Sequence, residues 1–279
     1  MSAFLLNSVD LSVYGIIAGH GDGNIAIAGC FSMPARIGVT SHSWDEEDAD
    51  EPFVTADEIM FAGRDVSFYG TIFGINSEIN TYLAALHVSC AGLIEAGGLV
   101  SFQTPYADMS IYIKDIQVER FHGAASIQIN FRETVVVLDS GTLPVTGVNK
   151  NQIDGIPLIS FGLYSSKKSG LYDLPELKDQ HFTRYRYEGN QFPMSKRKSK
   201  TLTLSGFIVG TSLADFQSKI KALYKVFSSA GTRTIKLNNE VSVVCFATEG
   251  FKVSNVLLYT TGVIANFDIK LTIVSVTYL

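Results

Sequence analysis

Two nine-residue segments of the sequence, Val66–Gly74 and Leu202–Gly210, align with each other without a gap. In both segments apolar residues or glycines occupy every second position, so each predicts a β-strand with one buried face. Gly70 and Gly206 fall at the same position of that face, where a missing side chain allows another element to approach closely. The repeated strand predicts that the chain folds as two related domains.

A helix is predicted to follow each repeated strand. Asn76 and Ser212 lie at matching positions and are the predicted N-caps, with Asp215 completing a capping box behind Ser212. Gly97-Gly98 and Gly231 are predicted to end the helices in the left-handed conformation. The apolar stripes expected to face the core are Ile79, Tyr82, Leu83, Leu86, Cys90 and Leu93 in the first helix, and Leu213, Phe216, Ile220, Leu223 and Phe227 in the second.

The segments around each strand and helix predict further strands, so the fold class is mainly β (α+β). Neither half alternates strands and helices often enough for a parallel sheet, which favours two tandem antiparallel β-sandwich domains, each with one flanking α-helix. Each half opens with a hairpin-like stretch that contains an aromatic-glycine pair, Tyr14-Gly15 or Phe161-Gly162. The predicted domains span residues 1–137 and 153–279, with a linker at 138–152. The further strands are expected within Leu99–Thr104, Ser110–Val118, Ser126–Glu133, Arg233–Asn238, Val241–Thr248 and Val253–Val276.

Composition narrows the class of protein further. The chain has 46% hydrophobic and only 18% charged residues, which argues against intrinsic disorder, and its net charge of −5 argues against a general nucleic-acid coat. It has no long apolar run, so no membrane anchor is expected, and its start has no features of a secretory signal. Cys30, Cys90 and Cys245 are widely separated and predict buried free thiols, from a protein made in a reducing cytoplasm.

The long loops that precede the two repeated strands carry opposite charges. The first has eight acidic and no basic residues from Asp45 to Glu58, whereas the second has six basic residues and one acidic residue from Arg184 to Lys200. Either these are two solvated loops that diverged, or they are arms that meet between neighbouring domains and enforce alternation of the two domain types. Trp44 either contributes to that contact or packs within the core or the arm. The candidate interface residues are Trp44, Asp45, Glu46, Glu47, Asp48, Asp50, Glu51, Arg184, Arg186, Lys196, Arg197, Lys198 and Lys200.

The sequence predicts no catalytic, cofactor-binding or metal-binding residue and no cofactor. The segment Gly19–Asn24 has the glycines of a phosphate-binding loop but no following Lys-Ser/Thr and no helix, so a glycine-rich hairpin turn is predicted instead. Neither a nucleophile elbow nor a zinc-protease pair of histidines occurs. The histidines with no metal-ligand spacing are His20, His42, His87, His122 and His181.

The element order, together with Val66–Gly74 and Leu202–Gly210, resembles the tail-tube fold of phage tails and related injection machines. Within that fold the N-terminal region resembles distal tail proteins, which form a ring between the tail tube and the tip. The resemblance implies a non-enzymatic structural protein whose strands join between neighbours around a channel, with DNA present only as cargo. It also implies a location in the virion tail and contact with other tail proteins.

The duplication leaves the subunit count open. Three two-domain chains would form a pseudo-sixfold trimeric ring, whereas six chains would form a hexamer of two stacked rings. The alternative function is a β-sandwich binding module for carbohydrate at a host surface, for which Tyr185, Tyr187 and Phe192 are the candidate aromatic platforms.

Overall fold

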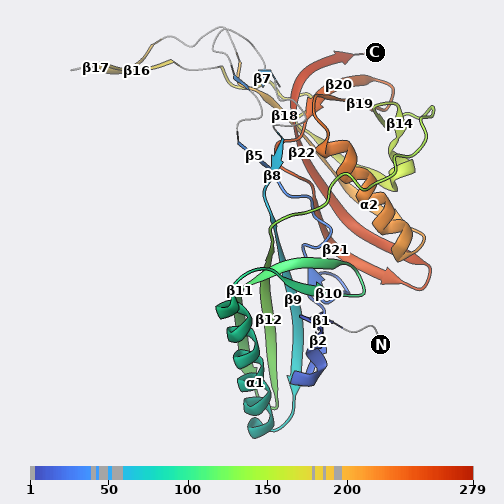
Figure 1. The fold of residues 1–279 in the computed structure, drawn as a ribbon. Coiled ribbons are helices and arrows are strands. Elements are labelled where there is room, and N and C mark those ends of the chain that lie inside the picture. The colour runs from blue at the N-terminus through green and yellow to red at the C-terminus, as the bar shows by residue number, and fades with distance from the viewer. Residues whose placement is uncertain are drawn as a thin grey trace.

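The computed structural model describes residues 4–38, 42–43, 50–51, 59–177, 180–184, 187–191 and 197–278. It is mainly β, with antiparallel strand pairing throughout and two α-helices among these residues. The mainly β fold class with a helix in each half is therefore confirmed. Figure 1 shows the two halves end to end, with α1 at one extremity and the C-terminus near the other.

The N-terminal half forms an eight-stranded sheet in the order β2-β1-β10-β11-β12-β9-β3, with β4 also paired to β9. Two of its strands, β11 and β12, form a long hairpin whose far end pairs Phe121 with Ala124. The strands are β1 (Leu5–Leu6), β2 (Val9–Asp10), β3 (Ile16–Ala18), β4 (Ile27–Ala28), β9 (Arg64–Phe73), β10 (Val100–Gln103), β11 (Asp108–Phe121) and β12 (Ala124–Glu133).

The C-terminal half forms a second eight-stranded sheet in the order β14-β13-β19-β20-β22-β18-β15, with β21 also paired to β22. Position by position, this order repeats that of the first sheet, and β18 takes the place of β9. The strands are β13 (Gln152–Ile153), β14 (Ile156–Pro157), β15 (Leu163–Ser169), β18 (Lys200–Gly210), β19 (Arg233–Leu237), β20 (Val241–Phe246), β21 (Lys252–Tyr259) and β22 (Gly262–Tyr278). The range Val253–Val276 thus holds two strands joined by a turn.

The helices α1 (Asn76–Ala96) and α2 (Leu213–Ser228) follow β9 and β18 as predicted. Ser212 caps α2 by accepting a hydrogen bond from the Asp215 amide at 3.1 Å, but Asp215 in turn accepts from the Thr211 amide and not from Ser212. The prediction of Asn76 as the N-cap of α1 is wrong. Ile75 holds that place, and the Glu78 carboxylate accepts a hydrogen bond from its amide at 3.1 Å. A carboxylate in the first turn therefore satisfies the amide of the cap residue.

The short segments before β3 and β15 are also alike. A 3₁₀ helix, η1 (Leu11–Tyr14) or η3 (Leu158–Phe161), follows each opening hairpin. Each ends at a glycine with left-handed backbone, Gly15 with φ of 68° and Gly162 with φ of 69°. Glycine is required here because other residues adopt this conformation only with strain.

The repeated strands bury the face that the sequence predicts. Val66, Phe68 and Ile72 are buried along β9, and Gly70 lies between them against Ile16 of β3. In β18 the equivalent Gly206 is half-buried, and a Cβ there would collide with the Tyr164 carbonyl of β15. The close approach predicted at both glycines is therefore confirmed.

The two sheets differ where β11 of the N-terminal half runs without interruption. It has a single register shift between Ile113 and Asp115, whereas residues 247–251 separate β20 from β21 at the corresponding point of the second sheet. At this interruption the backbone groups of residues 247–251 are not part of either strand. They are therefore available to bind another segment of the chain.

The remaining described segments connect or extend the sheets. Residues 138–151 contain no helix or strand, and Leu138 within them is buried. Short strand pairs occur in the loops before β9 and β18, and Figure 1 shows the pair β16·β17 extending away from the body. These strands are β5 (Arg36–Ile37), β6 (His42–Ser43), β7 (Asp50–Glu51), β8 (Met60–Phe61), β16 (Gln180–Arg184) and β17 (Tyr187–Gln191).

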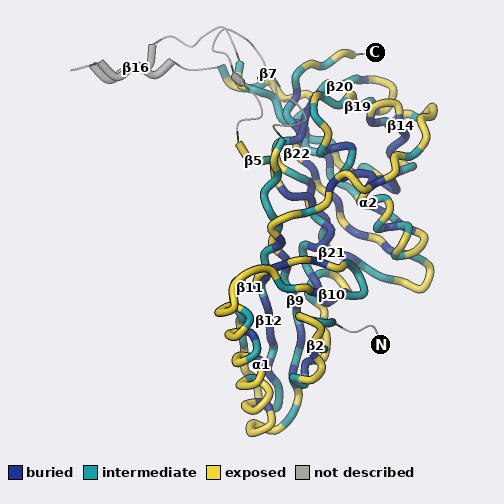
Figure 2. Tube along the Cα trace, in the orientation of Figure 1, coloured by how far each residue is buried: buried dark blue, intermediate teal, exposed yellow. Residues whose placement is uncertain are grey.

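The buried side chains of both halves form one continuous hydrophobic cluster. Figure 2 shows the buried residues following the long strands of each sheet and continuing across the junction. Neither helix in the described part of the chain has the length and apolarity needed to cross a bilayer.

Candidate functional site

The junction between the halves is built around the segment Gly29–Arg36, here called the docking segment. It leaves the first sheet after β4 and runs along the interruption in the second sheet. The Met33 amide donates to the Phe251 carbonyl at 2.8 Å, and the Arg36 amide donates to the Thr248 carbonyl at 2.9 Å. The backbone groups released between β20 and β21 are thus satisfied by the other half of the chain.

Side chains of the docking segment pack against α2. Phe31 meets Phe216 edge to face with ring centroids 5.1 Å apart, and both side chains are buried. The Arg36 guanidinium donates to the carbonyls of Phe227 and Ser229, at 3.2 and 3.1 Å, where α2 ends. A cation at this end interacts favourably with the helix dipole and satisfies carbonyls that have no partner within the helix.

The glycine-rich segment Gly19–Asn24 makes a second contact between the halves. It forms a turn closed by a bridge between Asp22 and Ile25, which confirms the turn prediction. The Asn24 side chain donates to the Leu258 carbonyl at 2.8 Å and accepts from the Leu258 amide at 2.6 Å. As far as the structure describes the chain, the edge of β21 opposite β22 has no partner strand at Leu258. The Asn24 side chain makes there the two hydrogen bonds that a neighbouring strand would make.

A buried ion pair lies beside the docking segment. Arg64 Nε is 2.6 Å from Glu133 Oε2, and the two side chains are only 9% and 8% exposed. Arg64 also donates to the Tyr224 hydroxyl of α2 at 2.8 Å and to the Ser32 carbonyl at 3.2 Å. One guanidinium thus joins β9, β12, the docking segment and α2. Burial raises the pKa of Tyr224 to about 12, so its hydroxyl stays protonated and donates to Ser32.

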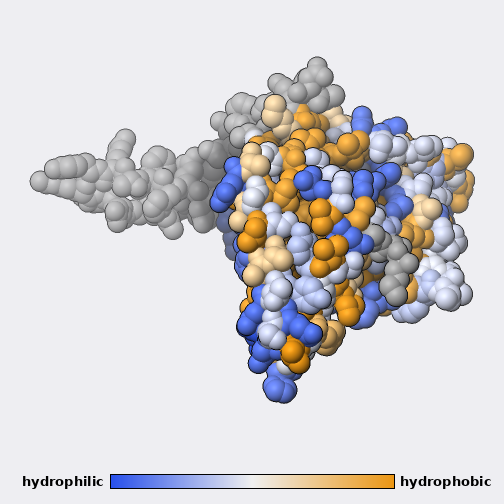
Figure 3. Space-filling model, turned by 60° about the horizontal axis from the view of Figure 1, so that its bottom comes forward, coloured by the Kyte–Doolittle hydropathy of each residue, from blue (hydrophilic) through white to orange (hydrophobic). Residues whose placement is uncertain are grey.

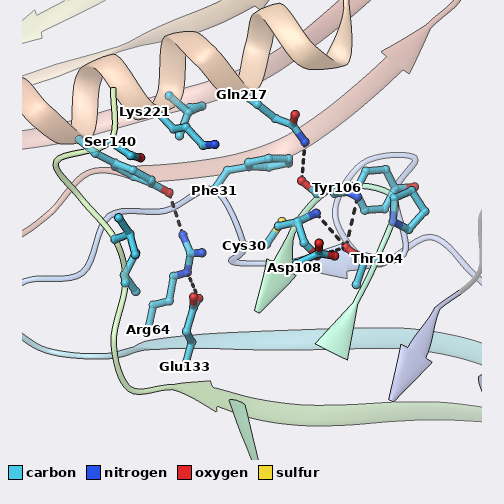
Figure 4. A pocket seen from close by; sticks show the side chains of 16 residues that line it. Cys30, Phe31, Arg64, Thr104, Tyr106, Asp108, Glu133, Ser140, Gln217 and Lys221 are labelled. Atoms are coloured by element: carbon cyan, nitrogen blue, oxygen red, sulfur yellow. Dashed lines mark hydrogen bonds and ion pairs between the residues drawn. The ribbon is translucent and has the colours of Figure 1, made fainter. Parts of the chain in front are cut away.

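An open groove of about 570 Å³ lies over this ion pair, as Figure 4 shows. Its walls come from the loop after β10, from residues 136–140 and from α2, and Gln217 spans it by donating to the Tyr106 carbonyl at 2.5 Å. The Cys30 thiol lies in the lining, but burial raises its pKa to about 12, so a thiolate nucleophile is not available at neutral pH. The polar contacts around this groove join the two halves of the chain.

The other chemistry-bearing side chains are dispersed. Within the described ranges, no group of three or more His, Cys, Asp or Glu residues could hold a metal ion. The three cysteines are buried free thiols, as predicted.

The structure describes only part of the two charged arms. Trp44, Asp45, Glu46, Glu47, Asp48, Arg186 and Lys196 lie outside the described residues. The backbone of Asp50 and Glu51 forms β7, which lies against β22 of the C-terminal half, and Arg184 ends β16. The described part of the acidic arm therefore lies over the other half of its own chain.

The described basic residues contact the base of their own arm. Lys198 Nζ pairs with Glu176 Oε2 at 2.8 Å, and Arg197 Nη1 donates to the Pro175 carbonyl at 2.6 Å. Lys200 Nζ donates to the Leu171 carbonyl.

Sequence reasoning missed the residues that join the halves, including Phe31, Arg36 and Arg64. One signal was available: Gly29–Pro34 reads Gly-Cys-Phe-Ser-Met-Pro, and Gly170–Pro175 reads Gly-Leu-Tyr-Asp-Leu-Pro. Glycine, an aromatic residue, a long apolar residue and proline recur at the same spacing in both halves.

Comparison with known proteins identifies the C-terminal half. Residues 156–272 match the family model described as the phage tail protein RIFT-related domain, a range that runs from β14 into β22. No curated protein matches the chain.

Among solved structures, the chain is similar to the Dit (gp 19.1) protein of phage SPP1, described as a paradigm of the hub adsorption apparatus in phages that infect Gram-positive bacteria. The identity is 11% and the TM-score 0.37, with 99% of each chain covered. The family match confirms the resemblance to phage tail proteins for the C-terminal half: the chain contains a phage tail protein RIFT-related domain and is a structural component of a phage tail.

Proposed function

We propose that the chain is a distal tail protein that forms a ring around the channel of the tail. The observation that carries the proposal is the strand order, which is the same in both sheets and includes a helix at the same place. If the C-terminal half is a phage tail domain and the N-terminal half repeats its topology, one chain supplies two such domains. The domains then span residues 1–137 and 153–279, joined by the linker 138–152.

Details of the backbone support a tandem duplication. Gly29 and Gly170 both have left-handed backbone, with φ of 84° and 86°. A Cβ at either glycine would collide with the carbonyl of Asp65 or Thr201, which hold the same place in β9 and β18. Matching backbone requirements at matching places favour common descent, because hydrophobic patterning alone does not impose them.

The sheet edges support assembly. Within the described residues, β3 and β15 end the strand paths of the two sheets and pair on one side only. An unpaired edge is exposed to association with another chain, and a closed ring covers such edges. The charged arms then meet between neighbouring domains, which favours a ring of three chains in which the two domain types alternate. Six chains in two stacked rings are the other arrangement.

A ring in the tail implies further properties of the chain. The chain carries no catalytic activity, contacts other tail proteins and is synthesised in the host cytoplasm, and DNA passes the ring only as cargo. The comparisons do not favour a carbohydrate-binding module. Of its candidate aromatic platforms, Tyr185 and Phe192 lie outside the described residues, and only the backbone of Tyr187 is described.

The experiment is a native mass measurement of the purified chain, combined with negative-stain electron microscopy. We expect closed rings whose mass corresponds to three chains of 30.4 kDa. A particle of six chains rejects the trimer but keeps the ring. A protein that stays monomeric at all concentrations overturns the ring function.

A further inference from the structure

We infer that the segment Gly170–Leu177 binds the exposed face of α1 in a second copy of this chain. We call Gly170–Leu177 the exposed segment. The inference rests on the proposed ring and identifies the surfaces that close it. The side-chain part of the contact between the halves, in which the docking segment packs against α2, serves as the template for the contact between chains.

The exposed segment holds the same place in its half as the docking segment does in the N-terminal half. After the left-handed glycine, Cys30 and Leu171 are both buried, at 3% and 4% exposure. Pro34 and Pro175 lie at the same distance from their glycines. The two segments therefore leave their sheets in the same manner.

The next side chains have opposite environments in the two segments. Phe31 and Met33 are 5% and 6% exposed because they are covered by the C-terminal half, whereas Tyr172 and Leu174 at the same positions are 69% and 76% exposed. Tyr172 stacks on Tyr278, with ring centroids 6.4 Å apart. The exposed segment thus presents apolar side chains of the kind that the docking segment buries.

The two helices differ in burial as the two segments do: most of α2 is covered, whereas most of α1 is not. Residues on several sides of α2 are buried, including Ala222, Tyr224 and Val226, and Tyr224 donates to the Ser32 carbonyl of the docking segment. On α1 only Ile79, Leu86 and Cys90 are buried. Figure 2 shows most of α1 in the colour of exposed residues.

The uncovered face of α1 is apolar. Val88 and Ile94 are 75% and 53% exposed, and Ala84, Ala85 and Ala91 are exposed as well. Figure 3 turns this end of the molecule toward the viewer and shows hydrophobic residues on its surface. Apart from His87 and Glu95, the exposed residues between Ala84 and Ala96 are apolar or glycine. An exposed apolar surface of this kind is typical of a protein–protein contact.

A groove of about 320 Å³ marks the place where a partner would sit. It lies where α1 ends and β10 begins, and Ile94, Leu99 and Tyr112 line it. In the C-terminal half, the corresponding place between α2 and β19–β20 is occupied by Arg36, which binds the carbonyls of Phe227 and Ser229. The same part of the fold is therefore filled in one half and empty in the other.

The occupant has to be a second copy. The exposed segment contacts Tyr278, next to the C-terminus, whereas α1 lies at the opposite end of the molecule in Figure 1. The segment cannot reach α1 of its own chain. A contact that uses a different surface of each copy is head-to-tail, and its repetition closes a ring when the rotation between copies divides a full turn.

The test uses two variants with substitutions at exposed positions, Leu174→Glu and the double variant Val88→Glu with Ile94→Glu. Each removes one of the two surfaces, so each alone is expected to run as a monomer of 30.4 kDa in light scattering after size exclusion. An equal mixture retains one intact pair of surfaces and is expected to form a dimer and nothing larger. A matched control, Val148→Glu, lies in the linker at a fully exposed apolar residue and should assemble as the wild type does.

The outcomes separate this inference from the proposed function. If the wild type forms rings and both variants do so too, the ring stands and these surfaces are not its interface. If the wild type is monomeric, the ring itself fails and the inference falls with it. Near-ultraviolet circular dichroism of each variant must match that of the wild type, so a change in mass reports assembly.

Discussion

At the scale of single residues, Arg64 and Glu133 form a buried ion pair whose disruption should be costly. Arg64→Met leaves the Glu133 carboxylate buried without its cation and also removes the bond to Tyr224 across the junction. We expect the free energy of unfolding to fall by about 3–5 kcal/mol, the usual cost of breaking a buried pair from one side. Urea denaturation followed by circular dichroism measures this loss.

The control for Arg64→Met is an exposed pair. Lys114 and Asp65 lie 3.3 Å apart with side chains 42% and 58% exposed, so Lys114→Met should cost less than about 1 kcal/mol. Replacing Arg64 and Glu133 together should cost less than replacing Arg64 alone, because no uncompensated charge remains. Equal losses for Arg64→Met and Lys114→Met would contradict this account.

The buried Cys245 thiol predicts a loss of stability in alkali. Burial raises its pKa to about 12, whereas an unfolded cysteine ionises near pH 8.5. Since the folded pKa is the higher one, the contribution to stability is complete below pH 8.5 and declines as the pH rises toward 12. Between pH 9 and 11, the unfolding free energy of the wild type should fall more steeply than that of Cys245→Ala, by about 1.4 kcal/mol per pH unit.

This comparison requires a reductant, so that no disulfide forms in the unfolded chain. Other groups titrate in the same range in both proteins, and the difference between the two slopes isolates the thiol. Parallel slopes would show that the Cys245 thiol ionises equally in the folded and unfolded states.

At the scale of elements, two glycines should respond to alanine with opposite signs. A Cβ at Gly206 would collide with the Tyr164 carbonyl where β15 pairs with β18, so Gly206→Ala should destabilise the protein by about 1–3 kcal/mol. Gly92 lies inside α1 with no atom near its would-be Cβ, so Gly92→Ala should stabilise it by about 0.5–1 kcal/mol. Thermal unfolding of both variants measures the two effects. A loss of stability in Gly92→Ala would show that α1 is constrained there by more than helix propensity.

At the scale of the whole molecule, the arms predict a salt-dependent assembly. Arg184→Glu, Arg186→Glu and Lys196→Glu together reverse charge on the basic arm and spare the described contacts at its base. If that arm meets an acidic arm, assembly should weaken, and the effect should be larger at low salt, where exposed charges act over longer distances. Sedimentation velocity at two salt concentrations measures the change.

The control for the arm variant is Lys198→Glu, which breaks the pair with Glu176 inside the chain. It should disturb the base of the arm with less effect on assembly. If the triple variant assembles as the wild type does at both salt concentrations, the arms do not meet.

Much of the fold was predictable because periodicity is local. Val66, Phe68 and Ile72 alternate along β9, and Phe216, Ile220 and Phe227 recur along α2, so the buried face of each element could be identified. The cap of α1 could not, because Ile75 and not Asn76 is the N-cap, and Glu78 binds the Ile75 amide. Several residues can fill a cap, and tertiary packing selects among them.

The sequence by itself determined the buried faces of the repeated strands, the presence of a helix after each of them and the alternating pattern that β9 and β18 share. Only the tertiary structure decided which repeated side chains are covered: Met33 is buried against the other half, whereas Leu174 at the matching position is exposed. It also decided that Arg64 pairs with Glu133, 69 residues away, and reaches Tyr224 in the other half. The physical reason is that local patterns record which side of an element avoids water, while the group that covers that side is set by contacts between distant segments.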